Sequence, residues 1–219
     1  MAKSEETRSL IVTTAMRLFT ENGYDRTTMR AIAAEAGVSV GNAYYYFSSK
    51  DQLIQGFYDE IARQHLTAAR TLLDGETGFA ARLKAVLLCW LDVAEPYHRF
   101  GTQLFVNAAD PESPLSPFSD DSSAAREASI GLMREVVAGS DVKLDTELRD
   151  QLPELLWLYQ MGVVLFWVHD RSAGTKRSRL LVERSVPLLA RLAALSRLRV
   201  FRPVSREIVD LIHELSKRN

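Results

Sequence analysis

Three tyrosines stand in a row at residues 44 to 46, and Lys50 follows four positions later. If this stretch is helical, successive side chains point about 100° apart, so one small core cannot bury all three rings. At least two rings must face outward, where a phenol offers an apolar ring and a hydroxyl that reaches a phosphate or a base edge. Lys50 would add an ammonium and exposed backbone amides beside the same phosphates. This chemistry suits nucleic-acid binding, and the alternative is that the aromatic residues form only a packing cluster.

The residues around the tyrosines predict two short helices joined by a three-residue turn. Thr27 or Thr28 can cap the first helix, Gly37 ends it, and Ser39 caps the second. The small Ala33 lets the two helices approach, and Gly37 can take a positive φ at the bend. The expected buried face of the first helix comprises Met29, Ile32, Ala33 and Ala36. Such a pair forms a helix-turn-helix, whose second helix lies in the DNA major groove.

The rest of the chain also has helical periodicity, and β-strand alternation is absent. Ser4 can cap a first helix that ends at Asn22, and Ser48 with Asp51 matches a capping box for a fourth helix reaching about Leu73. Pro187 should kink or restart the helix that contains it. Further helices are expected at 79–93, 96–108, 123–138, 144–169, 176–199 and 204–217, and residues 110–123 form a proline-rich loop with an extended path. We therefore expect an all-α chain, with a helix-turn-helix domain at 1–48 and a larger helical domain at 49–219.

The composition is that of a globular protein, with 219 residues, 47% of them hydrophobic and 25% charged. The single cysteine, Cys89, excludes a disulfide framework within the chain and a cysteine-based zinc cluster, which favours a reducing compartment. The first ten residues carry charges where an export signal needs an apolar stretch. The most apolar run, residues 155–168, is too short to span a bilayer. We expect a cytoplasmic protein without a membrane segment.

The formal net charge of -1 conceals a segregation of charge along the chain. Residues 1–50 carry six Lys and Arg against five Asp and Glu, residues 51–170 carry nine against 19, and residues 171–219 carry twelve against four. The net charge of the chain therefore does not indicate nucleic-acid binding. The prediction must rest on where individual basic and polar side chains lie. We interpret the basic C-terminal segment as a solvated face that offsets the acidic middle, or alternatively as an additional surface for DNA.

The stretch AMRLFTENGYDRTTMRAIAAEAGVSVGNAYYYFSSKDQL resembles the N-terminal domain of the TetR family of bacterial transcriptional regulators. The resemblance covers roughly residues 8 to 54 without a gap. After about residue 60 only the all-helical pattern and the total length are similar. The features that carry it are Gly23-Tyr24, Thr27-Thr28, Ile32-Ala33, Ala36-Gly37-Val38-Ser39, Tyr44-Tyr45-Tyr46-Phe47 and Lys50.

The resemblance assigns roles to eleven residues in DNA binding. It implies that phosphates are held by Thr27, Thr28, Tyr44, Tyr46 and Lys50. It implies that the bases face Arg30, Val40, Gly41, Asn42 and Tyr45, and the capping Ser39 lies in the same surface. Arginine can pair with guanine, asparagine with adenine, and a valine methyl with the methyl of thymine. Gly41 departs from the larger residues common at its position and removes a contact.

A single helix-turn-helix contacts too few phosphates and bases for selective binding, so we expect a homodimer on palindromic double-stranded operator DNA. The run LLWLYQMGVVLFWV in helix 144–169 is apolar nearly all round, which suits burial between an interior and a partner subunit. The resemblance implies a four-helix bundle built from helices 144–169 and 176–199 of two subunits. The alternative is that both helices fill the core of a monomer.

The resemblance implies that the middle of the chain binds an unknown small-molecule effector, which we expect to be largely apolar, although each candidate residue could also be ordinary core. The large, adaptable apolar candidates are Trp90, Phe100, Met133, Trp157 and Met161, and the candidates that orient the ligand are Gln103, Asn107 and Gln160. Effector binding would tilt the fourth helix and release the operator, so the protein is most simply a repressor. The alternatives are an activator, a regulator that senses a protein partner, and a helical interaction module without DNA recognition.

Enzyme motifs are weak in this sequence. Glu95 and His98 match the Glu-x-x-His pattern of carboxylate-bridged iron sites, but the pattern occurs once and needs a companion. Ser140 and Lys143 match Ser-x-x-Lys without the partner motifs of serine acyl-enzymes. The four histidines are scattered, and no phosphate-cradling glycine loop is present. We therefore expect no catalytic residues, no metal and no cofactor.

Overall fold

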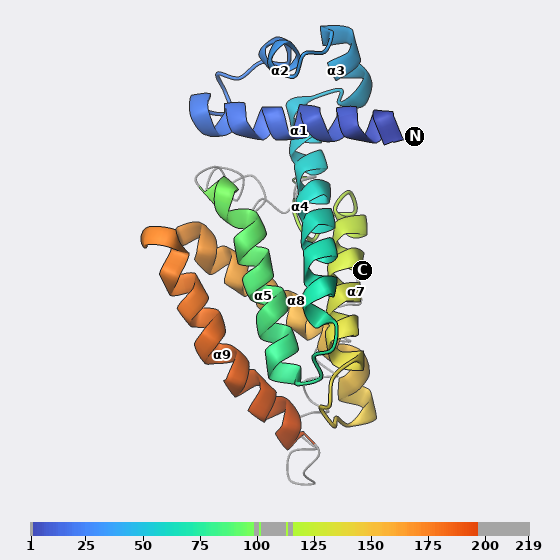
Figure 1. Cartoon of the computed structure of the whole chain (residues 1–219), viewed down its shortest axis with the longest axis vertical. Helices are drawn as coiled ribbons and strands as arrows, with labels where there is room; N and C mark the ends of the chain where they lie inside the picture. The colour runs from blue at the N-terminus through green and yellow to red at the C-terminus, as the bar shows by residue number, and fades with distance from the viewer. Residues whose placement is uncertain (1, 99–100, 102–112, 114–115, 197–219) are drawn as a thin grey trace. The chain divides into compact units, whose positions relative to one another are not determined.

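The computed structural model of the chain describes residues 2–98, 101, 113 and 116–196. Within these ranges every regular element is a helix, which confirms the predicted all-α class (Figure 1). The α-helices are α1 (Ala2–Asn22), α2 (Met29–Glu35), α3 (Val40–Tyr46), α4 (Lys50–Leu73), α5 (Phe79–Ala94), α7 (Ser123–Ala138), α8 (Thr146–His169) and α9 (Lys176–Leu195). The 3₁₀ helix η1 (Glu95–Tyr97) directly follows α5, and the 3₁₀ helix η2 (Ala173–Thr175) directly precedes α9. None of the described helices is long and apolar enough to cross a membrane.

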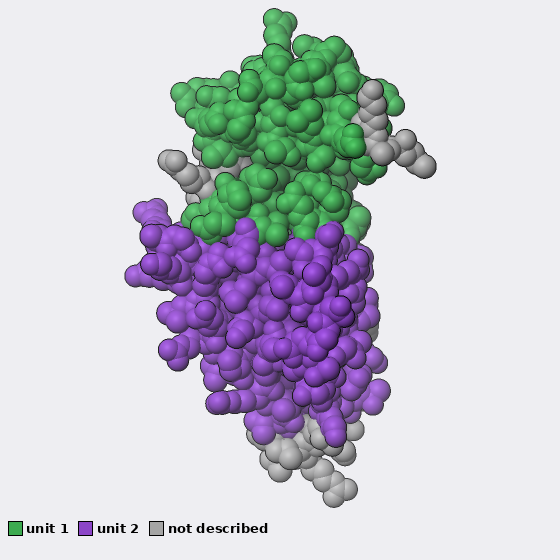
Figure 2. All heavy atoms as spheres, in the orientation of Figure 1, with its two compact units in different colours: residues 1–64, 93–126 green, residues 65–92, 127–219 purple. Residues whose placement is uncertain are grey.

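The chain divides into two compact units, coloured separately in Figure 2. Unit 1 contains Met1–Gln64 and Val93–Arg126, and unit 2 contains His65–Asp92 and Glu127–Asn219. Helix α4 therefore contributes residues to both units. The predicted division of function at residue 48 stays a prediction.

The helix-turn-helix of unit 1 is built as its sequence predicts. Thr28 caps α2 by accepting a hydrogen bond from the Ala31 amide at 3.2 Å, and Ser39 caps α3 by accepting one from the Asn42 amide at 3.1 Å. Gly37 has a φ of +66° in the turn, a conformation that side chains with a Cβ rarely adopt. The buried face of α2 contains all four predicted residues, and it packs in one core with the apolar faces of α1, α3 and α4.

A close approach of three helices sets the position of α3 within unit 1. A Cβ at Gly56 of α4 would lie 2.7 Å from Cε1 of Phe47 and 3.2 Å from Cγ2 of Val12 on α1. Only glycine therefore fits at this crossing without movement of its neighbours. Phe47 ends α3 and is buried, so α3 is fixed at its C-terminal end while its other face remains open to solvent.

Some details of the predicted elements are wrong. Ser4 does not cap α1, because this helix begins at Ala2 and Ser4 lies within its first turn. The α4 cap is Ser49, whose hydroxyl accepts from the Gln52 amide at 3.2 Å, because the helix begins one residue later than a Ser48 and Asp51 capping box requires. Helix α9 continues through Pro187 to Leu195, which excludes a restart at this proline, and a kink there stays a prediction. Pro117 lies in a turn closed by the Ser119 amide and the Ser116 carbonyl, so this part of the loop is not extended. Apart from the start of 96–108, the helices expected at 96–108 and 204–217 lie outside the described residues.

The buried side chain of Arg82 forms hydrogen bonds with the C-terminal ends of two helices in unit 2. The Arg82 guanidinium donates to the carbonyls of Leu73 at 2.9 Å, Val136 at 3.1 Å and Glu135 at 2.9 Å, and also to that of Glu76. These carbonyls belong to the C-terminal ends of α4 and α7 and to the turn after α4, where a cation is favourable. An exposed ion pair of 2.7 Å between Arg70 and Glu135 joins the same two helices.

Candidate nucleic-acid interface

The outward face of α3 carries two exposed aromatic rings. Tyr45 exposes 81% of its surface and Tyr44 exposes 50%, while Ala43 on the same helix is fully buried. The prediction that at least two of the three rings face outward is therefore confirmed. Val40 and Gly41 are exposed at the N-terminal end of α3, and Asn42 is half-buried. These residues form one surface at the end of α3 that would meet base edges in a helix-turn-helix complex.

The third tyrosine of the run links α3 to α1. Tyr46 is half-buried, its ring meets Tyr45 edge to face at 5.3 Å, and its hydroxyl lies 3.2 Å from the Ser4 hydroxyl. The Arg8 guanidinium lies 5.1 Å from the centre of the adjacent Phe47 ring and 3.5 Å from the Asp59 carboxylate. The first turns of α1 therefore support the end of α3 that carries the tyrosines.

The predicted phosphate contacts at the start of α2 have different environments. The Thr28 side chain is exposed, and because it accepts the capping hydrogen bond, its hydroxyl proton can be donated outward. Arg30, two residues further along, is exposed as well. Thr27 is buried, and its hydroxyl lies 2.9 Å from the Gly23 carbonyl and 3.2 Å from the Leu18 carbonyl. A role for Thr27 in DNA binding stays a prediction that its hydroxyl position does not support.

The ammonium of Lys50 is held in position by the carbonyl and the ring of Tyr24. It donates to the Tyr24 carbonyl at 2.8 Å and lies 4.0 Å from the centre of the Tyr24 ring. The Tyr24 hydroxyl in turn donates to the Asp51 carboxylate at 2.7 Å. Burial, followed by this bond to a carboxylate, raises the pKa of Tyr24, so its hydroxyl keeps its proton. The ammonium is thus held beside the first turn of α4, with hydrogen-bond donors left for a phosphate.

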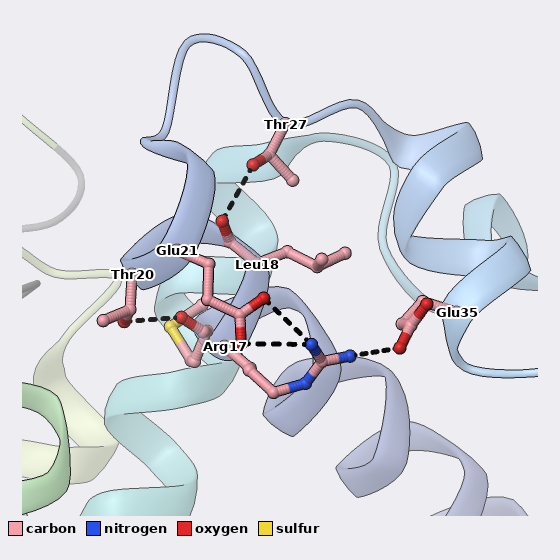
Figure 3. Close-up of polar contacts among 7 residues, drawn as sticks. Arg17, Leu18, Thr20, Glu21, Thr27 and Glu35 are labelled. Atoms are coloured by element: carbon pink, nitrogen blue, oxygen red, sulfur yellow. Dashed lines mark hydrogen bonds and ion pairs between the residues drawn. The ribbon is translucent and has the colours of Figure 1, made fainter.

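An ion pair joins α2 to α1 (Figure 3). Arg17 of α1 contacts Glu21 on its own helix at 3.0 Å and Glu35 at the end of α2 at 2.5 Å. Hydrogen bonds to the two carboxylates raise the pKa of Arg17. The Thr27 hydroxyl meets the Leu18 carbonyl in the same view, so the turn before α2 is held as well. Sequence reasoning missed these supports, because contacts between α1 and the later residues do not follow a local spacing.

The predicted effector residues that the structure describes lie in unit 2, on α5, α7 and α8. Met133, Trp157 and Gln160 are buried, and Trp90 and Met161 are half-buried. Trp90 meets Trp167 edge to face at 5.3 Å, which joins α5 to α8. Phe100, Gln103 and Asn107 lie outside the described residues. Among the residues that are described, no group of three potential ligands could hold a metal ion.

Comparison with known families covers most of the chain. Residues 11–56 match the family described as bacterial regulatory proteins, tetR family, and residues 82–215 match the tetracyclin repressor-like, C-terminal domain. The first match contains α2, α3 and the start of α4, and the second contains α7, α8 and α9.

Curated relatives are similar over the DNA-binding end of the chain. The HTH-type transcriptional regulator TtgR of Pseudomonas putida is 38% identical over 68 residues, which cover 31% of this chain and 32% of that protein. The HTH-type transcriptional repressor KstR2 of Mycobacterium tuberculosis is 30% identical over 95 residues, which cover 42% of this chain and 46% of that protein. The matched segments thus span about a third to a half of the length of these two relatives.

Solved structures share the fold over nearly their whole length. A TetR transcriptional regulator from Nitrosomonas europaea superposes with a TM-score of 0.62 at 20% identity, covering 83% of this chain and 96% of that one. The regulator FadR from Bacillus subtilis, solved in complex with stearoyl-CoA, superposes with a TM-score of 0.64 at 16% identity, covering 83% of this chain and 97% of that one. At such identities the likeness concerns the fold alone. Because these two family models together match residues 11–56 and 82–215, the chain belongs to the tetR family of bacterial regulatory proteins.

Proposed function

We propose that the protein is a repressor that binds a palindromic operator as a homodimer and releases it when a small, largely apolar molecule binds unit 2. The observation that carries the DNA-binding part is the exposure of Tyr44 and Tyr45 on α3, beside the capped starts of α2 and α4. Exposed aromatic rings with hydroxyls, a nearby ammonium and helix N-termini are groups that contact phosphates and bases. Such a regulator would act in the cytoplasm, where operator DNA lies.

The proposed dimer rests on apolar side chains that the single chain leaves exposed on α8 and α9. They are Leu158, Leu165 and Phe166 on α8, and Leu180, Leu188 and Leu192 on α9. Their exposed fractions run from 39% for Leu158 to 62% for Leu192. On each helix they recur at spacings that place them on one face. An apolar surface of this kind marks an interaction site, and a second copy would cover it by twofold symmetry.

The proposed effector class rests on buried residues of unit 2 and on the structural neighbours. The buried Met133 and Trp157 offer an apolar environment, and Gln160 offers a polar group within it. Two FadR regulators with this fold were solved with stearoyl-CoA and with lauroyl-CoA, which are ligands with long apolar chains. The relative KstR2 is named a repressor. Together these observations favour an apolar effector and repression.

The proposal is tested by measuring operator affinity with and without effector. Fluorescence anisotropy of a labelled palindromic duplex should report binding by the purified full chain, with scrambled duplex as the control. A library of apolar metabolites should then contain a compound that lowers this affinity by about 5-fold to 150-fold, the range of a coupling of about 1 to 3 kcal/mol. If every compound that binds the protein leaves the operator affinity unchanged, the effector part of the proposal is wrong. The DNA-binding part is wrong if the palindromic duplex binds no better than the scrambled one.

A further inference from the structure

Gln160 is a polar residue on the buried face of α8. Its side chain is 2% exposed, and the residues three and four positions before it and three after it are buried and apolar, namely Leu156, Trp157 and Val163. These spacings place all four on one side of the helix. An amide therefore stands in a row of large apolar side chains.

The Gln160 Oε1 atom has no hydrogen-bond partner among the described residues. Several other buried polar side chains of unit 2 have hydrogen-bond partners: Ser178 donates to Asp170 at 2.8 Å, His65 lies 2.9 Å from the Val86 carbonyl, and Arg82 donates to four carbonyls. Native proteins pair the large majority of their buried polar atoms, so an orphaned acceptor needs an explanation. A leucine or methionine at position 160 would fill the same space without that cost.

We propose that Gln160 binds the effector, and that the effector is an apolar molecule carrying a neutral hydroxyl. This inference rests on the proposed function and names the ligand class for the same site. A hydroxyl donates to the amide oxygen and can also accept from the amide nitrogen, so it pairs with either end of the side chain. A carboxylate has acceptors only, so it could accept from the amide nitrogen but would leave the amide oxygen without a donor. The apolar body of the ligand would contact Trp157, one turn away on the same face.

The first test is the stability of the ligand-free protein. Replacing Gln160 with methionine, which has nearly the same shape, should raise the melting temperature, because the unpaired acceptor is removed and apolar packing is gained. The matched control is Gln151→Met, the same replacement at a half-buried glutamine of the same helix that does make polar interactions, and it should give no increase. A lower melting temperature for Gln160→Met would show that the amide is a structural group, which overturns the inference.

The second test compares two probes that differ in one hydrogen-bond donor. 1-Decanol and its methyl ether have the same apolar chain, but only the alcohol can donate to Oε1. Titration by thermal shift and tryptophan fluorescence should show that wild type binds the alcohol about ten-fold more tightly, which is the effect of one net hydrogen bond. Gln160→Met should bind both probes within about two-fold of each other.

Three results would overturn the inference: equal binding of both probes by wild type, binding of neither, or an undiminished preference for the alcohol in Gln160→Met. These measurements need no DNA. A failure of the proposed function would instead appear as unchanged operator affinity in the presence of a compound that does bind. The two failures are therefore distinguishable.

Discussion

Tyr45 has most of its side chain in solvent, and half of the neighbouring Tyr44 is exposed as well. Neither ring fills the core of unit 1, which is closed by Ala43 and Phe47 from the same helix. Their place on α3 therefore has no packing explanation. A nucleic-acid surface explains both the exposure and the hydroxyls, since stacked or inserted rings lose their contact with water only in the complex.

Lys50 and Arg30 should differ in what they contribute to DNA binding. Lys50→Ala should weaken binding to all sequences alike and reduce the salt slope by about one, because one phosphate contact is lost. Arg30→Ala should instead relax the preference at one base pair per half-site, by about 1 to 3 kcal/mol. Anisotropy titrations on operator variants at several salt concentrations separate the two effects. If Arg30→Ala changes only the salt slope, the division between positioning and reading residues is wrong.

Gly41 offers a second test at the residue scale. A Cβ at this position has no atom within 4 Å apart from its immediate neighbours and its own helix backbone, so a side chain would point into open space. Gly41→Ala should therefore raise the free energy of unfolding, by up to about 1 kcal/mol, through the better helix propensity of alanine. Urea denaturation measures the change. A destabilised variant would mean that the surface of α3 is less open than the structure shows.

The elements of unit 1 follow closely from sequence, because their signals are local. Thr28 and Ser39 lie where short helices need caps, and Gly37 lies where the chain needs a positive φ. The helix starts at Ser123 and Lys176 also follow from periodicity. The predicted cap of α4, Ser48, is one residue away from the observed cap, Ser49. Serine is a good cap at either position, and the residue at which the helix begins determines which of the two serves.

Contacts between residues far apart in the sequence could not be predicted, although they determine where the side chains of the site lie. No spacing rule indicates that Lys50 meets the Tyr24 carbonyl or that Arg17 reaches Glu35. The buried position of Thr27 has the same origin, because its hydroxyl bonds to carbonyls of α1 and of the turn that follows it. Residue types therefore revealed the surface, and tertiary packing decided which of its hydroxyls face outward.

Asp170 makes the start of α9 sensitive to acid. Its buried carboxylate accepts bonds from the amides and hydroxyls of Ser172 and Ser178, at 2.7 to 2.9 Å. Burial alone would raise the pKa of Asp170, but the four bonds outweigh it and lower the pKa to about 2. The stabilisation is thus present above the usual carboxyl pKa of 3.8 and is lost as pH falls from about 4 through about 2.

Asp170→Asn tests this assignment. The variant should be less stable at pH 7 by about 1 to 3 kcal/mol, because an amide nitrogen replaces one of the two accepting oxygens and meets donors. Its stability should fall less than that of wild type between pH 4 and pH 2.5. Urea denaturation at pH 7, 4 and 2.5 compares the two proteins. Equal losses in both would assign the acid sensitivity to other carboxylates.

At the scale of the whole molecule, the exposed leucines of α9 should determine the oligomeric state. Leu192→Glu should convert the proposed dimer to a monomer at micromolar concentration, because it would place a charge in the proposed apolar contact. The loss of the dimer should also lower the operator affinity, since each monomer would then bind one half-site alone. Sedimentation velocity and anisotropy measure the two effects on the same samples.

Leu72→Glu is the matched control for the dimer prediction. Leu72 is 50% exposed on α4, comparable to Leu192, but it lies outside the proposed α8 and α9 surface. This variant should remain a dimer with wild-type operator affinity. A Leu192→Glu protein that stays dimeric would place the subunit contact elsewhere.

The central claim is that the exposed face of α3 reads duplex DNA in a twofold complex. Selection of bound duplexes from a random-sequence pool by the purified full chain tests it most directly. Twofold binding through α3 should give a palindromic consensus whose half-site centres lie about 10 base pairs apart, or a multiple of that, and enrichment should be lost when Tyr44 and Tyr45 are both replaced by alanine. An absence of enrichment even at low salt, or an unchanged consensus and affinity in the double variant, would contradict it.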